Sequence, residues 1–297
     1  MPVVERRSVL SGISVEEAMR KQVVQMPKSA SIDNCINRMI KYKVNAVLII
    51  DGEQAPVGVV SKTDIMGAFY AGFPIETALE NIMVGTPLFC YPDDELETSL
   101  DTMRQNGIHR LYVLGAESKA VAGVLAYPDI VGLLYRYCRA CDKGLLKTRR
   151  KRDEDKFERY KVKDVMTASV SHQLDNENLA QVIEGLSAHH FGAVLIKNSG
   201  GDPVGVVSKT DLIIAYKHGI SIETGVDTVM KAPVQSCNTD AYLATALQQM
   251  LLKDVQRLFV HSNESRQIVG VLSLSDAVRF RSGSCRACVS SRLVVGS

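Results

Sequence analysis

The feature that most constrains the fold is an exact internal repeat. The chain contains the stretch Pro56-Val-Gly-Val-Val-Ser-Lys-Thr-Asp64, and the same nine residues return without a gap at Pro203 to Asp211, 147 residues later. The same offset relates the chain from Val15 to at least Cys141 with its second half. Self-similarity at a fixed offset is the signature of duplicated structural units. We therefore expect two halves with the same fold.

Each half is itself double. Gly58-Val-Val-Ser61, followed by Asp64, has a weaker counterpart in Gly123-Val-Leu-Ala126, followed by Asp129, and the second half repeats both. The sequence thus predicts four units in two tandem pairs. The expected division is a first pair at 1–145 (units about 15–72 and 79–141), a charged linker at 146–161, a second pair at 162–283 (units about 162–219 and 226–283) and a C-terminal tail at 284–297 with a Cys-x-x-Cys pair.

One unit has a β-α-β-β-α pattern. The spacing of Ile32, Cys35, Ile36, Met39 and Ile40 predicts one face of an amphipathic helix. The segments that follow are an apolar strand at 46–50, a second strand at 57–60 and a helix from about 62 to 71 that ends at Gly72. A short strand is expected at Val23-Val24, before the first helix. The predicted fold class is mixed α/β, with each unit too small to be stable alone and paired with its neighbour.

Bulk properties exclude several classes of protein. The chain has 297 residues, 46% of them hydrophobic, which suits two packed domains. A net charge of +2 gives no reason to expect a nucleic-acid partner. No apolar run approaches the ~20 residues of a membrane span, and the start of the chain has no signal-peptide core. We expect a cytoplasmic protein whose seven cysteines are thiols or metal ligands.

In three units, a strand that carries a glycine is followed by a helix that begins Ser-x-x-Asp. One interpretation is a capping box alone, in which the serine and the aspartate satisfy backbone N–H groups of the first turn. The other adds a ligand. A helix N-terminus attracts phosphate, a carboxylate accepts hydrogen bonds from ribose hydroxyls, and glycine lets a ligand approach the backbone closely. Both interpretations remain open, and we favour the second.

These residues resemble the CBS-domain family, named after cystathionine beta-synthase. The resemblance covers about residues 15–141 and 162–283, and four units in one chain are similar in layout to the gamma subunit of AMP-activated protein kinase. It implies two disc-like pairs related by a pseudo-twofold axis. It also implies that the Ser/Thr of each turn lies near phosphate, that the Asp holds ribose, and that backbone at the start of a strand flanks adenine. The residues nominated in this way are Ser61, Thr63, Asp64, Ser208, Thr210, Asp211, Ser273, Ser275, Asp276, Ala46 and Ala193.

The second unit departs from the motif. It reads Ala126-Tyr127-Pro128-Asp129, so the hydroxyl is missing and Pro128 removes one N–H from the first helical turn. Asp129 survives, but we expect its site to be weak, empty or purely structural.

Two arginines stand at duplicate positions. Arg110 and Arg257 each begin a strand, and the resemblance places phosphate-binding Arg, and sometimes His, at this point. His109 precedes Arg110, whereas Gln256 precedes Arg257. A solvated arginine is the alternative, but two guanidinium groups able to grip phosphate bidentately favour binding. The charge run from Lys147 to Lys163 is interrupted by acidic residues and is interpreted as a solvated helical linker.

The Cys-x-x-Cys pairs are not required by the family. Cys138 and Cys141 are duplicated at Cys285 and Cys288. Four thiolates could hold zinc or an iron–sulfur cluster, and each pair alone could be redox-active, although a duplicated structural relic is the simpler interpretation. Cys90 and Cys237 are also duplicates and are expected to be partly buried.

Three classes of function follow. The leading expectation is a non-catalytic regulatory module that binds AMP, ADP, ATP or a related adenosine ligand and signals to an unknown protein partner, with homo-oligomerisation as another output. The second is a metal- or redox-responsive protein that uses the Cys-x-x-Cys pairs. The third is an unrecognised nucleotide-converting enzyme, although no hydrolase triad, zinc-hydrolase motif or Walker A loop is present in the sequence.

Overall fold

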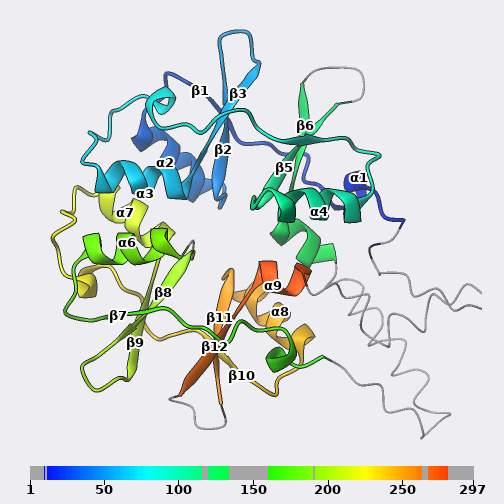
Figure 1. The fold of residues 1–297 in the computed structure, drawn as a ribbon. Coiled ribbons are helices and arrows are strands. Elements are labelled where there is room, and N and C mark those ends of the chain that lie inside the picture. The colour runs from blue at the N-terminus through cyan, green and yellow to red at the C-terminus, as the bar shows by residue number, and fades with distance from the viewer. Residues whose placement is uncertain are drawn as a thin grey trace, which may run out of the picture.

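The computed structural model describes residues 10, 12–115, 120–133, 160–189, 191–262 and 267–279. Within these ranges the four predicted units are present, and each follows the β-α-β-β-α order (Figure 1). The elements are β1 (Gln25–Pro27), α2 (Ile32–Lys41), β2 (Ala46–Ile50), β3 (Pro56–Ser61) and α3 (Lys62–Tyr70) in unit one; β4 (Phe89–Cys90), α4 (Leu96–Gln105), β5 (Arg110–Leu114), β6 (Val121–Ala126) and helical residues 127–133 in unit two; β7 (His172–Leu174), α6 (Leu179–Ala188), β8 (Ala193–Lys197), β9 (Pro203–Ser208) and α7 (Lys209–Lys217) in unit three; and β10 (Ser236–Asn238), α8 (Leu243–Lys253), β11 (Arg257–His261), β12 (Ile268–Ser273) and α9 (Leu274–Arg279) in unit four.

Each unit contains one three-stranded sheet. In unit one, β1 pairs with β2 in parallel, and β2 pairs with β3 antiparallel, and the other three sheets repeat this order. The parallel pair requires a crossover, which α2 supplies. All five residues of β2 are buried, which explains why this strand reads as a continuous apolar run rather than an alternating one.

The helix boundaries follow from capping. Ser31 precedes α2 and accepts a hydrogen bond from the Asn34 N–H at 3.3 Å. Four residues of the predicted face of α2 are fully buried (Ile32, Cys35, Ile36 and Met39), but the fifth, Ile40, is 40% exposed. Helix α3 ends at Tyr70, and Gly72 follows at φ +72°, in the left-handed conformation that stops a helix. The short strand predicted before α2 is present but spans Gln25–Pro27 rather than Val23-Val24, of which only the Val24 carbonyl bonds β2, accepting from the Leu48 N–H at 3.0 Å.

The four units lie around a ring, with units one and two along its upper half in Figure 1 and units three and four along its lower half. Helices α3 and α7 contact each other across the two halves, so unit one packs against unit three. Phe69 and Tyr216 stack at this contact, with ring centroids 4.9 Å apart. One apolar core is shared by units one and three and a second by units two and four. Shared apolar cores therefore join the two pairs, whereas the predicted linker at 146–161 lies outside the described residues except for 160 and 161.

Within each pair, the segment that begins one unit pairs with the sheet of the sister unit. Arg20 bridges Val124 of unit two, and Val84 bridges Val59 of unit one. The second half repeats the exchange, since Thr167 bridges Val271 and Lys231 bridges Val206. Four equivalent residues, Arg20, Val84, Thr167 and Lys231, thus lie beside the last strand of the four units.

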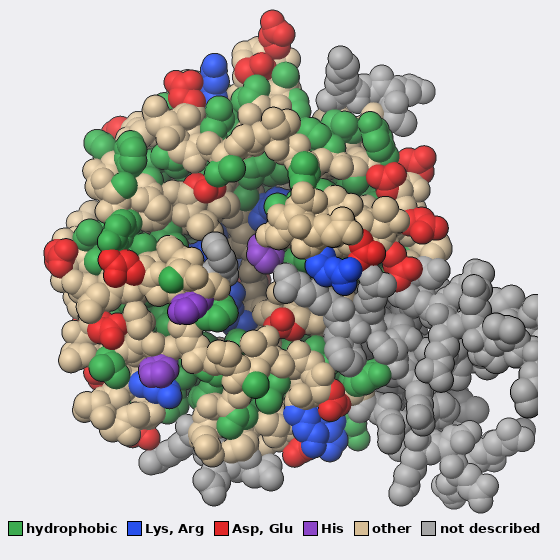
Figure 2. All heavy atoms as spheres, in the orientation of Figure 1, with side chains coloured by type: hydrophobic (Ala, Val, Ile, Leu, Met, Phe, Trp, Pro, Cys, Tyr) green, Lys and Arg blue, Asp and Glu red, His purple; other side chains and the backbone are tan. Residues whose placement is uncertain are grey.

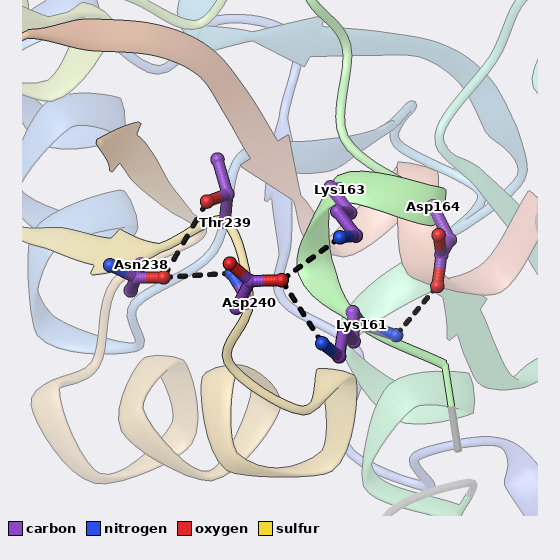
Figure 3. A network of polar contacts seen from close by, with 6 residues as sticks. All are labelled: Lys161, Lys163, Asp164, Asn238, Thr239 and Asp240. Carbon is purple, nitrogen blue, oxygen red and sulfur yellow. Dashed lines mark hydrogen bonds and ion pairs between the residues drawn. The ribbon is translucent and has the colours of Figure 1, made fainter. Parts of the chain in front are cut away.

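A short helical segment begins each unit, and the segment of unit three is bonded to unit four. These segments are the four-residue helix α1 (Val15–Ala18) in unit one and the 3-10 turns η1 (Leu79–Asn81), η2 (Val162–Asp164) and η3 (Val226–Thr228) in units two, three and four. At η2, Lys161 and Lys163 both reach one carboxylate oxygen of Asp240, at 3.0 and 2.9 Å (Figure 3). No helix in the described ranges is both long and apolar enough to cross a membrane.

Candidate functional site

The Ser-x-x-Asp turns are capping boxes in the structure. In unit one, the Ser61 hydroxyl caps α3 by accepting from the Asp64 N–H at 3.4 Å, and Asp64 Oδ2 accepts from the Ser61 N–H at 2.7 Å. The Ser61 hydroxyl also donates to this same Oδ2 at 2.7 Å. Ser208 and Asp211 in unit three and Ser273 and Asp276 in unit four repeat the arrangement. The capping-box interpretation of the motif is therefore confirmed, and any role in ligand binding comes in addition to capping.

Only one oxygen of each aspartate is used by its own turn. In all three turns, the serine binds Oδ2. Within the described ranges, no hydrogen bond or ion pair reaches Oδ1 of Asp64 or of Asp276, and both residues are half-buried rather than buried. Each of these two turns therefore presents a carboxylate oxygen with unused acceptor capacity at the N-terminus of a helix.

The other two turns have a cation on that second oxygen. Lys231 Nζ lies 2.6 Å from Asp211 Oδ1, and Arg20 Nε lies 2.7 Å from Asp129 Oδ1. Asp129 keeps half of the capping box, since its Oδ2 accepts from the Ala126 N–H at 2.9 Å, but the serine is absent. Burial raises the pKa of Asp129, and Arg20 acts against that rise.

The glycine of the motif has a different role from the one we expected. A Cβ added to Gly58 would lie 2.8 Å from Met83 Sδ, and Gly123, Gly205 and Gly270 meet Met19, Met230 and Met166 in the same way, at 2.8, 2.9 and 2.6 Å. The space is filled by the exchanged segment of the sister unit, so the glycine admits a methionine of the protein itself. The interpretation that it admits a ligand is not needed.

The two arginines reach across to the sister unit. Arg110 donates from Nη1 to the Ala46 carbonyl at 2.9 Å, and Arg257 donates to the Ala193 carbonyl at 3.4 Å. Burial lowers the pKa of both side chains, to about 10 for Arg257. The structure thus brings each nominated arginine to the nominated strand start, and neither is a freely solvated side chain.

Two lysines that the sequence analysis missed, Lys62 and Lys209, lie near these arginines, where the two halves meet. Lys62 donates to the Thr210 hydroxyl at 2.9 Å, and Lys209 donates to the Thr63 hydroxyl at 2.8 Å, so the contact is reciprocal across the two halves. Burial, then the charge of Arg110, lowers the pKa of Lys62 to about 8, and burial lowers the pKa of Lys209, followed by Arg257. Figure 2 shows a hollow in the middle of the ring with Lys or Arg side chains, and a His, at its wall.

A signal for these lysines was present in the sequence. Both belong to the nine-residue identity and occupy the first position of a helix, where the helix dipole disfavours a cation. A duplicated lysine at such a position indicates an anionic partner, or a hydrogen bond within the protein, that offsets the unfavourable interaction of the ammonium with the helix dipole. The threonine hydroxyls supply part of that offset in the structure.

The remaining nominated residues lie close to these turns. His109 packs edge-on against Tyr127, with ring centroids 5.5 Å apart, and the Ser275 hydroxyl lies 2.7 Å from that of Ser273. Cys90 and Cys237 are buried, as expected, and burial raises the pKa of their thiols to about 12 and about 11. Cys138, Cys141, Cys285 and Cys288 fall outside the described residues. Among the residues that are described, no group of three or more His, Cys, Asp or Glu could hold a metal ion.

Comparison with known proteins gives a consistent result. The model of the CBS domain matches residues 15–71, 79–136, 162–218 and 226–283. The crystal structure of protein MJ1225 from Methanocaldococcus jannaschii, which its description proposes as an archaeal homologue of g-AMPK, is similar with a TM-score of 0.74 at 17% identity, over 90% of this chain and 99% of that one.

A second structure and a sequence match point the same way. An uncharacterised conserved protein from Pyrococcus horikoshii gives a TM-score of 0.59 at 16% identity, again over 90% of this chain and 99% of that one. In sequence, MJ1225 is 22% identical over 197 residues, which span 64% of this chain and 66% of MJ1225. Because the four matched segments cover most of its length, the chain belongs to the CBS-domain family.

Proposed function

We propose that this protein is a non-catalytic regulatory module that binds an adenine nucleotide, or a related adenosine ligand, at its Ser-x-x-Asp turns and signals to a partner protein by a change of conformation. The observation that carries the proposal is that no described residue makes a hydrogen bond or ion pair with Oδ1 of Asp64 or of Asp276, while a serine holds the other oxygen of each in place. A fixed carboxylate oxygen suits the paired hydroxyls of a ribose, because a carboxylate accepts hydrogen bonds and donates none.

The proposal assigns the phosphate end of the ligand to the basic centre, which consists of Arg110, Arg257, Lys62 and Lys209. Hydrogen bonds to the carbonyls of Ala46 and Ala193 hold the guanidinium groups of Arg110 and Arg257 in place. Lys62 lies near enough to Arg110 for their charges to interact, and Lys209 likewise to Arg257. Cations crowded together in a half-buried site gain from a polyanion that neutralises them. A nucleotide would therefore bind more tightly here than the corresponding nucleoside.

Signalling would use the contact between the two halves. Lys62 and Lys209 each bind a threonine of the opposite half, Thr210 and Thr63. A phosphate that draws either ammonium away from its threonine changes a bond that joins the two halves. A ligand shifts a conformational equilibrium only by its difference in affinity for the two states, and this contact is where such a difference could arise.

Calorimetric titration of the unmodified protein with adenosine, AMP, ADP, ATP and S-adenosylmethionine tests the proposal. We expect heat from at least one phosphorylated ligand, and loss of one binding event in each of Asp64→Asn and Asp276→Asn. Asp93→Asn is the matched control, because Asp93 is exposed and lies outside the turns. A folded protein that gives no heat with any member of the panel would refute the proposal.

A further inference from the structure

The four turns share one backbone arrangement but differ in a single neighbouring side chain. The residues concerned are Arg20, Val84, Thr167 and Lys231, which form the same bridge to the last strand of a unit. Each follows a methionine whose sulfur lies 2.6–2.9 Å from where the motif glycine would carry a Cβ. A cation of the basic centre lies within charge–charge range of each aspartate, namely Lys209 for Asp64, Arg110 for Asp129, Lys62 for Asp211 and Arg257 for Asp276. Because the backbone contacts repeat, the residue after the methionine is the neighbour that differs in charge from turn to turn.

Two of these residues are cations and two are neutral. Arg20 faces Asp129 and Lys231 faces Asp211, and each cation lies on Oδ1. Val84 and Thr167 stand at the equivalent places beside units one and four, where Oδ1 of Asp64 and of Asp276 has no partner within the described part of the chain. Each pair of units thus carries one cation and one neutral residue.

We infer that Arg20 and Lys231 occupy Oδ1 of Asp129 and Asp211 and so prevent ligand hydroxyls from binding the turns of units two and three. One turn in each pair, in units one and four, then remains open to a ligand. This inference rests on the proposed function. The Asp211 side chain is only 5% exposed, and its Oδ1 makes no hydrogen bond with the described residues but forms an ion pair with Lys231 Nζ at 2.6 Å. A ligand hydroxyl would have to displace the Lys231 ammonium and leave this buried carboxylate without its counter-charge, which is strongly unfavourable.

Lys231 is the residue of this ion pair that can be substituted without disturbing the core. The Lys231 side chain is 70% exposed, so it reaches Asp211 from the solvent side and can be removed without opening the core. Val84 is 59% exposed, so a lysine fits there too. The duplication therefore offers a reciprocal exchange, in which the cation is removed from unit three and introduced beside unit one.

The experiment counts AMP sites by calorimetry in the full-length protein. We expect two sites in the unmodified protein, one in Val84→Lys and three in Lys231→Val. Leu252→Lys and Lys28→Val are the matched controls, since both change the same charge at exposed positions away from the turns, and both should keep two sites. If Lys231→Val fails to fold because Asp211 loses its partner, the Val84→Lys arm decides alone.

The outcomes separate this inference from the proposed function. An unmodified protein that binds no adenosine ligand overturns both. AMP binding with the same number of sites in Val84→Lys as in the unmodified protein overturns the closure alone. A folded Lys231→Val variant that gains no site, or loses one, also overturns it, and loss of a site would instead make Lys231 a ligand-binding residue.

Discussion

The lowered pKa of Lys62 makes a quantitative prediction about protons. Burial and the charges of Arg110 and Lys231 lower this pKa from 10.5 to about 8, although Asp211 and Asp254 act in the opposite direction. A phosphate bound beside Lys62 favours the ammonium and would return its pKa toward the ordinary value. Lys62 should then take up about 0.1 proton at pH 7, about 0.5 at pH 8 and about 0.9 at pH 9 when a nucleotide binds.

The sign of the pH dependence follows. Because the free protein loses the Lys62 proton above pH 8 and the complex keeps it, affinity falls as pH rises, by up to about tenfold between pH 7 and pH 9. The phosphate itself does not interfere, since its second pKa is about 6. Without ligand, the unfolded state binds more protons than the folded state between pH 8 and 10.5, so this group makes folding more favourable as pH rises through that window.

Calorimetry of AMP binding in buffers with different ionisation enthalpies measures this uptake. Lys62→Gln should remove the share that belongs to Lys62 and leave that of Lys209, whose pKa is lowered by burial and by Arg257. Lys28→Gln is the control, because the Lys28 side chain lies at the surface of the same unit. The same proton uptake at pH 9 in Lys62→Gln and in the unmodified protein would refute the reasoning.

Three further predictions concern binding, packing and assembly. Arg110→Ala and Arg257→Ala should weaken AMP roughly ten-fold to a hundred-fold while changing adenosine little, since a lost charged hydrogen bond costs about 1.5–3 kcal/mol; equal losses for both ligands, by calorimetry, would show that these arginines do not contact phosphate. Gly58→Ala should lower the thermal midpoint, because its Cβ would press on a methionine sulfur, whereas Gly52→Ala, with open space around it, should not; equal midpoints would refute this. Residues 1–145 alone should form a homodimer by light scattering, since the self-like α3 surface that buries Phe69 would be exposed, and Phe69→Ala in this fragment should weaken the dimer, while a stable monomer would contradict the packing.

Much of the fold was predictable because the duplication and the apolar periodicity agree. The 3.6-residue spacing of α2, the apolar run of β2 and the Gly72 stop each depend on local sequence, and the structure confirms all three. The strand at Val23-Val24 was placed wrongly because its register is set by β2, which comes later in the chain. Local pattern cannot specify where a parallel ladder begins.

The site was less predictable, because its decisive contacts join distant segments. The serine and the aspartate of each turn are neighbours in sequence, so their capping geometry could be foreseen. The pairing of Asp211 with Lys231 depends on the exchanged segment of the sister unit, which no local pattern reveals. Lys62 meets Thr210 only because the two halves pack through α3 and α7.

A crystal structure of the protein grown with a saturating concentration of AMP tests the central claim most directly. The account predicts ribose hydroxyls within hydrogen-bond distance of Oδ1 of Asp64 and of Asp276, with the phosphate directed toward the basic centre around Arg110, Lys62, Arg257 and Lys209. The ion pairs Asp211–Lys231 and Asp129–Arg20 should remain formed. AMP bound away from all four turns, or turns left empty in crystals of a protein that binds AMP in solution, would contradict the account.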